Sequence, residues 1–238
     1  MTYFRFRVNK FKITEELKNG CDVYKKTRWH LSSSRCYSSG AVPLILSVFL
    51  GATPTEGVNI FKFFADEAVK NGITTNAYAL ISIIGFALVT FGIFTLRDIL
   101  QNDESDNALM RLGAYLFFLG SLGLIIGWSL DNAIVWGEAD FAKHLMTIEM
   151  AFFFPSGVLY WAGVGFVALT LAGNSYVNSL FARGICLFAL IACALHIYTI
   201  LSIDPNSVST IMPLFVLTGI GNLIGPAFFI SIGIKMMK

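Results

Sequence analysis

A glutamate and a histidine, Glu149 and His196, lie inside the apolar segments of this chain, where ionisable groups are costly and therefore suggest chemistry. Glu149 lies about one turn into the run 145–171, and His196 lies about two turns before the end of the run 180–203. Consecutive spanning helices are antiparallel, so we expect both side chains at a similar depth, on the order of 6 to 10 Å below the same outer boundary. Such a pair could relay protons or bind a cation or polar ligand.

Two further polar side chains could complete a cluster around this pair. Asn222 lies near the middle of the run 209–234, and Asp131 follows the outer end of the run 109–130. We expect Glu149 and His196 to lie within hydrogen-bonding distance, directly or through one water molecule, of each other or of these two groups. We favour a hydrogen bond that only holds the two helices together, with the functional roles as alternatives.

A second kind of chemistry would use His144 together with His196. Both lie in the outer half of neighbouring spanning segments, where two histidines could be the axial ligands of a haem. The protein would then be a haem- or quinone-binding subunit of a membrane respiratory complex, whereas the Glu149–His196 pair would suit a small proton-coupled transporter. Both hypotheses stay open at the level of the sequence.

Enzyme and metal motifs are missing from the sequence. It contains no phosphate-binding loop, no Gly-x-Gly-x-x-Gly, no His-Glu-x-x-His and no Gly-x-Ser-x-Gly. It also has no Cys-x-x-Cys pair, and Cys186 and Cys193 lie about 10 Å apart along one helix, which favours a packing role. We therefore predict no metal site, no cofactor besides the haem considered above, and no enzymatic activity.

Five long apolar runs position these side chains and identify an integral membrane protein. They cover residues 75–96, 109–130, 145–171, 180–203 and 209–234. Each has the roughly 20 residues that a helix needs to cross a bilayer core of about 30 Å. Of all residues, 55% are hydrophobic and 13% charged, the latter about half the fraction in a soluble domain. The runs do not alternate in polarity, so we predict an all-α polytopic helical bundle rather than a barrel.

A shorter run, 41–52, would be the first of six crossings. Its twelve residues reach about 18 Å as a helix, which is less than a bilayer core needs. The lysines and arginines nevertheless favour a crossing, because nine in the tail and five in later segments then share one side, against three on the other. Without this crossing, the tail would lie on the opposite side. Twelve basic residues would then face five, and the later loops that carry the five would lie on the side with fewer basic residues. We predict six crossings of the domain 41–238, with both termini inside.

Residues 1–40 form a basic polar tail with nine basic and three acidic residues. We favour a cytoplasmic tail of a signal anchor, held near anionic lipid. The alternatives are a secretory signal cleaved after the run 41–52, a mitochondrial presequence with a cleavage region near Arg35-Cys36-Tyr37-Ser38, and a mis-assigned start codon. The layout of short-looped helices is typical of small bacterial inner-membrane proteins, with the mitochondrial inner membrane as the alternative.

Between the first two crossings, residues 53–71 predict a short surface helix on the outer side. Thr-Pro-Thr-Glu opens this segment and Asn71-Gly72 closes it. Phe61, Phe64 and Ala65 fall on one helical face, as in a helix that lies on the bilayer or caps the bundle.

Glycines one turn apart predict where spanning helices approach each other closely. Gly123 and Gly127 form one such pair, and Gly221 and Gly225 form another. We expect these glycines to pack against helices of the same chain or of a second copy. The expected partners are the lipid bilayer, a homodimer partner or other membrane-complex subunits, and no nucleic acid.

Overall fold

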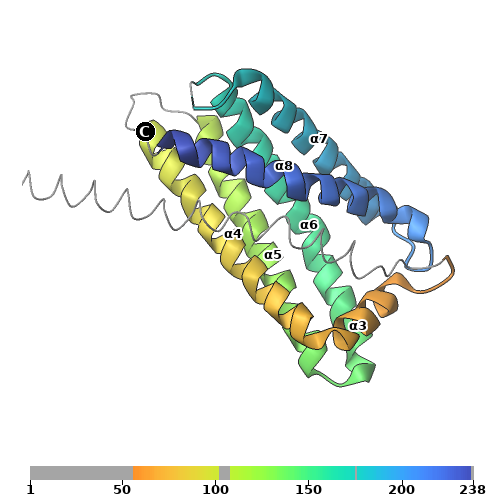
Figure 1. Ribbon diagram of the computed structural model, residues 1–238. Helices are drawn as coiled ribbons and strands as arrows, with labels where there is room; N and C mark the ends of the chain where they lie inside the picture. The colour runs from red at the N-terminus through yellow and green to blue at the C-terminus, as the bar shows by residue number, and fades with distance from the viewer. Residues whose placement is uncertain (1–55, 102–107, 175, 237–238) are drawn as a thin grey trace, which may run out of the picture.

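The computed structural model describes residues 56–101, 108–174 and 176–236, which are almost entirely helical (Figure 1). A short helix, α3 (Ile60–Lys70), precedes five long ones. These are α4 (Gly72–Gln101), α5 (Ala108–Trp136), α6 (Ala139–Ala172), α7 (Ser179–Ser202) and α8 (Met212–Met236), the last preceded by the 3-10 helix η1 (Val208–Thr210). No strand occurs in the described ranges, and the predicted all-α bundle is confirmed.

Each of the five long helices has the length and apolar composition of a membrane span, so the chain is a multi-pass membrane protein. The helices match the five long apolar runs, and most extend beyond them because a helix can continue into the polar boundary region. The predicted crossing at 41–52 and the basic tail 1–40 lie outside the described residues.

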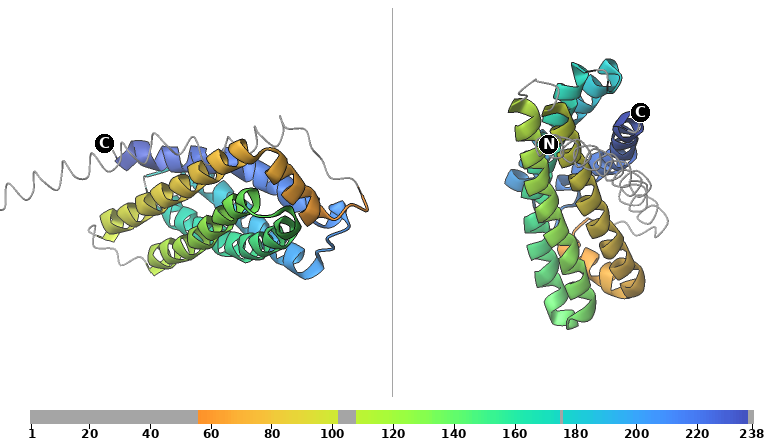
Figure 2. Two further views of the ribbon diagram at one scale, coloured as in Figure 1. Left: turned by 90° about the horizontal axis from the view of Figure 1, so that it is seen from below. Right: turned by 90° about the vertical axis from the view of Figure 1, so that its left-hand side faces the viewer.

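Helices α4 to α7 pack as neighbours in chain order, and α8 crosses one face of this row at an angle (Figures 1 and 2). The main hydrophobic core lies between these helices and contains Phe117, Trp161 and Phe228. Helix α8 contributes to it through Phe229, whose ring meets that of Phe117 with a centroid distance of 5.8 Å.

The predicted surface helix is α3, which lies across one end of the bundle (Figure 1). We call this the α3 end. The helix begins only at Ile60, because Asn59 is its N-cap and accepts a hydrogen bond from the Lys62 N–H at 3.1 Å. One face, with Phe61, Ala65 and Ala68, is buried against α5 and α6.

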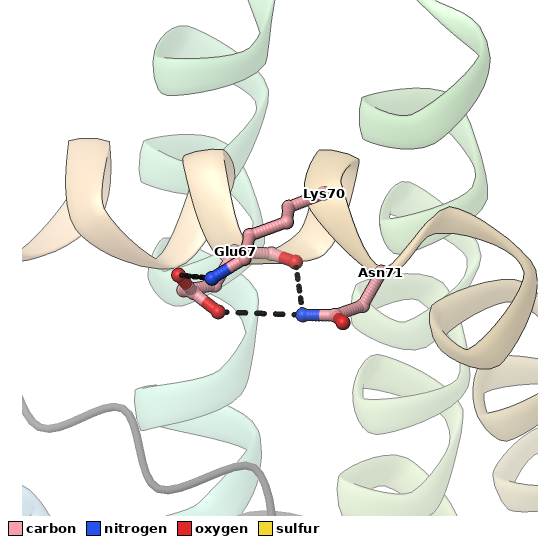
Figure 3. A network of polar contacts seen from close by, with 3 residues as sticks. All are labelled: Glu67, Lys70 and Asn71. Atoms are coloured by element: carbon pink, nitrogen blue, oxygen red, sulfur yellow. Dashed lines mark hydrogen bonds and ion pairs between the residues drawn. The ribbon is translucent and has the colours of Figure 1, made fainter.

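Polar contacts hold both ends of α3 in position. At its C-terminus, the Lys70 ammonium donates to the Glu67 carboxylate at 3.0 Å, and the Asn71 amide donates to the Glu67 backbone carbonyl at 2.9 Å (Figure 3). Before its N-terminus, the Glu56 carboxylate accepts hydrogen bonds from the Ser207 hydroxyl at 2.7 Å and the Val208 N–H at 3.2 Å. These hydrogen bonds hold the N-terminal end of α3 against the α7–α8 connection.

Candidate functional site

The α5–α6 interface is built on glycines that bring two backbones into contact. Three of them, seven residues apart, lie on the α6-facing side of α5: Gly113, Gly120 and Gly127. A Cβ at Gly120 would lie 2.6 Å from the Tyr160 Cα, and one at Gly163 would lie 2.6 Å from the Phe117 Cα. Both distances are far below van der Waals contact, so only glycine permits this approach.

The predicted glycine pairs differ in their packing. A Cβ at Gly123 would collide with the Ser156 side chain, and one at Gly127 would lie 3.2 Å from the Phe153 ring, so both face α6. Gly221 lies against the Trp161 ring, whereas Gly225 has no atom within 4 Å of its Cβ position. Sequence reasoning considered only four-residue spacing. It missed the seven-residue row of α5, whose spacing is the repeat of an antiparallel coiled coil.

Asp131 follows Gly127 by one helical turn, at the end of the glycine row of α5. Asp131 faces Glu149 of α6, which lies one turn before Phe153, and the two carboxyl groups are within hydrogen-bonding range of each other. Asp131 is 6% exposed and Glu149 is 2% exposed. An ionised carboxylate only accepts hydrogen bonds, so this contact requires a proton on one of the two groups. The arrangement is therefore a place where a proton can be held.

The surroundings of this acid pair, Asp131 and Glu149, separate it from the α3 end. On that side, Ile134 of α5 and Met146 of α6 form an apolar layer with the buried face of α3. On the other side, the Trp128 ring meets the Phe153 ring edge-on with a centroid distance of 5.1 Å. The pair thus lies between an apolar cap and an aromatic layer.

Helix α4 closes the site laterally. The Tyr78 hydroxyl lies beside Ser82 and close enough to Asp131 for an electrostatic interaction. The Tyr78 ring meets the Trp128 ring edge-on with a centroid distance of 5.0 Å. Of the two Glu149 oxygens, Oε2 is buried without a hydrogen-bond partner. The site therefore combines two carboxyls, a phenol and an indole from three helices.

His196 lies in a different layer of the bundle from Glu149. Its Nδ1 is 2.8 Å from the Ala192 carbonyl oxygen, and its ring packs directly on Gly157 of α6. Gly157 follows Glu149 by eight residues, which is about 12 Å along the helix. The expectation of equal depth measured the position of Glu149 from residue 145, where the apolar run begins. Helix α6 instead begins at Ala139 and extends beyond the end of α7 at Ser202.

Asn222 and His144 are also remote from the acid pair. Asn222 follows Gly221, which lies against Trp161, and Trp161 is about 18 Å beyond Glu149 along α6. His144 is exposed at the α3 end, about 20 Å along α6 from the Gly157 position where the His196 ring packs. The two histidines thus do not meet at the two sides of one haem iron in this arrangement. No group of three or more possible metal-binding side chains occurs in the described part of the chain.

Comparisons with family models, with curated proteins and with solved structures give no match.

Proposed function

We propose that this protein holds and transfers protons within a membrane, as a small proton-coupled transporter would, and that Asp131 and Glu149 form its proton-binding site. The observation that carries the proposal is the contact between two carboxyl groups that are only 6% and 2% exposed. The proposal replaces His196 with Asp131 as the partner of Glu149.

A purely structural contact would be built from other residues. Burying a polar group costs free energy unless it is fully hydrogen-bonded, and a stable contact would pair an acid with an amide, a hydroxyl or a base. Here the partner of each carboxyl group is another acid, and Oε2 of Glu149 has no partner. The contact is favourable only while a proton is present, which supports a role in proton binding.

Release of the shared proton would affect the position of the helices. Two like charges in contact repel each other strongly where water is scarce. The repulsion would favour a state in which α5 and α6 separate at Asp131 or a cation enters. A link between proton occupancy and helix position is what coupled transport requires.

We further propose that the protein resides in the inner membrane of a bacterium, with both termini inside. Arg97, Arg111, Arg183 and Lys235 all lie near the end of the bundle opposite α3. Positive charge gathers on the cytoplasmic side of membrane proteins, so the α3 end would face outward.

Infrared difference spectroscopy on the purified protein in lipid tests the proton-binding site. We expect the carbonyl band of a protonated carboxyl group in the wild type and its loss or shift in both Asp131→Asn and Glu149→Gln. Asp98→Asn is the matched control, since the exposed Asp98 carboxylate in α4 only accepts hydrogen bonds from Arg97. A band that is unchanged in both site variants, or absent from the wild type, would overturn the proposal.

A flux measurement tests the transfer step. In liposomes that contain a pH-sensitive dye, an imposed pH gradient should dissipate faster with the wild type than with either site variant, by at least about tenfold. Asp98→Asn should behave as the wild type does. Equal dissipation in wild-type and empty liposomes would count against proton transfer, while leaving the infrared test of binding intact.

A further inference from the structure

Buried polar groups without partners are concentrated at one interface of the bundle. Glu149 Oε2 is one of seven such side-chain atoms among the described residues, and the other six lie on α4 and α5. They belong to Asn76, Tyr78, Ser82 and Thr90 on α4 and to Ser121 and Trp128 on α5. In a native structure, a group of this kind needs a partner such as a buried water molecule or an ion.

Three of these groups are hydroxyls, and several other serine and threonine hydroxyls in the described helices bond within their own helix. Hydroxyls usually bond to a carbonyl one turn earlier in their own helix. Six described side chains do so: Thr95, Ser129, Thr147, Thr170, Ser202 and Ser231. Ser82, Thr90 and Ser121 do not, although they are only 1%, 9% and 1% exposed. The Thr90 and Ser121 hydroxyls are therefore available to a partner between the helices, whereas the Ser82 hydroxyl lies beside that of Tyr78.

The register of α4 against α5 arranges these groups in a row. Tyr78 packs on Trp128 and Phe94 packs on Phe118, so the two helices are antiparallel neighbours. Ser82 and Thr90 follow Tyr78 at spacings of four and twelve residues, so they lie on one i, i+4 ridge of α4, which turns about 40° around the helix with each step. Thr90 is about 18 Å from Tyr78 along the helix axis.

Ser121 extends the row on α5. It lies three residues beyond Phe118, at the level that the antiparallel register assigns to Thr90. The side chain between Ser82 and Thr90 in the α4 row is Phe86, whose ring packs edge-on against Tyr160 of α6 with a centroid distance of 5.8 Å. This ring separates the polar groups near Tyr78 and Ser82 from those near Thr90 and Ser121.

The acid pair needs a route to water, and the α3 end is covered by the apolar layer of Ile134, Met146 and the buried face of α3. We infer that buried water molecules lie between α4 and α5, with Tyr78, Ser82, Thr90 and Ser121 as their polar lining, and that they give the acid pair a proton path toward the middle of the bundle, away from the α3 end. This inference rests on the proposed function for its proton-conducting part. Its hydration part stands on the unpaired hydroxyls alone.

Radiolytic footprinting tests the hydration part without reference to any activity. Hydroxyl radicals formed from bound water modify nearby side chains, so Tyr78 and Trp128 should be labelled although their polar atoms are shielded from bulk solvent. Trp136, which is 75% exposed, should be labelled as the positive control, and the core residue Trp161, which is 8% exposed, should be protected. Protection of Tyr78 and Trp128 to the level of Trp161 would show a dry interface and overturn the inference.

Hydrogen–deuterium exchange of the acid pair tests the conducting part. In the double variant Thr90→Val, Ser121→Ala, the carboxyl band should shift on transfer to heavy water at least about tenfold more slowly than in the wild type. Thr170→Val is the control, because this buried hydroxyl bonds to Phe166 in its own helix. An unchanged exchange rate in the double variant would refute the path while leaving the proton-binding site in place. The absence of a carboxyl band would refute the proposed function, and the footprint would then still decide on hydration.

Discussion

Gly120 of α5 lies directly on the backbone of Tyr160 in α6, where an added Cβ would be 2.6 Å from the Tyr160 Cα and 2.8 Å from the Ser156 carbonyl oxygen. Backbone atoms cannot move aside as a flexible side chain can. The contact therefore fixes the separation of the two helices that carry Asp131 and Glu149, about three turns from the acid pair.

Gly120→Ala should lower the free energy of unfolding by about 1 to 3 kcal/mol, because the methyl group overpacks a backbone contact. Gly225→Ala is the control, since it has no atom within 4 Å of the Cβ position and alanine is the better helix former. Denaturation in detergent, followed by circular dichroism, measures both. Equal stability of the two variants would contradict the close α5–α6 packing.

Glu149→Gln should fold with a free energy of unfolding within about 1 kcal/mol of the wild type, because the glutamine amide can donate permanently to the Asp131 carboxylate. Glu149→Ala should instead cost about 1 to 3 kcal/mol, because it leaves the buried Asp131 carboxyl without its partner. Thermal melts of both variants in the same detergent check this order. A glutamine variant as unstable as the alanine variant would indicate that the two side chains do not contact each other.

The five long helices could be predicted from the sequence because spanning a bilayer demands a length of apolar chain that few other structures share. Asp131 and Glu149 were both recognised as polar groups within or at the edge of a span. Their mutual contact was one of several that the sequence allowed, and the sequence could not single it out, because it gives only the depth of a residue along its own helix. The relative shift of neighbouring helices depends on packing, here on the glycine row of α5, which four-residue spacing did not reveal.

His196 shows the same limit in another way. Its depth was counted from the end of an apolar run, whereas the structure seats its ring on Gly157, the one kind of residue that leaves room for it. Where helix ends extend into the boundary region by different lengths, as α6 and α7 do, apolar runs do not give the register between neighbours.

Gly157→Ala should destabilise the protein by about 1 to 3 kcal/mol, because the new methyl group would collide with the imidazole ring of His196. Combining it with His196→Ala should recover part of this loss, since the smaller side chain makes room for the methyl group. A double-mutant cycle on unfolding free energies should give a coupling of at least about 0.5 kcal/mol. Additive effects would contradict the contact between the ring and α6.

A reporter fused after Lys238 should be cytoplasmic, and a reporter inserted at Gly137, in the α5–α6 turn, should lie on the opposite side. The reason is the distribution of lysine and arginine, which places five later basic residues on the side of the C-terminus and, with the predicted crossing at 41–52, also the nine basic residues of the tail. The α5–α6 turn and the C-terminus lie at opposite ends of the bundle, so exactly one of the two reporters should be accessible from outside. Accessibility of the reporter after Lys238 from outside would reverse the proposed orientation and remove the argument that the run 41–52 crosses the membrane.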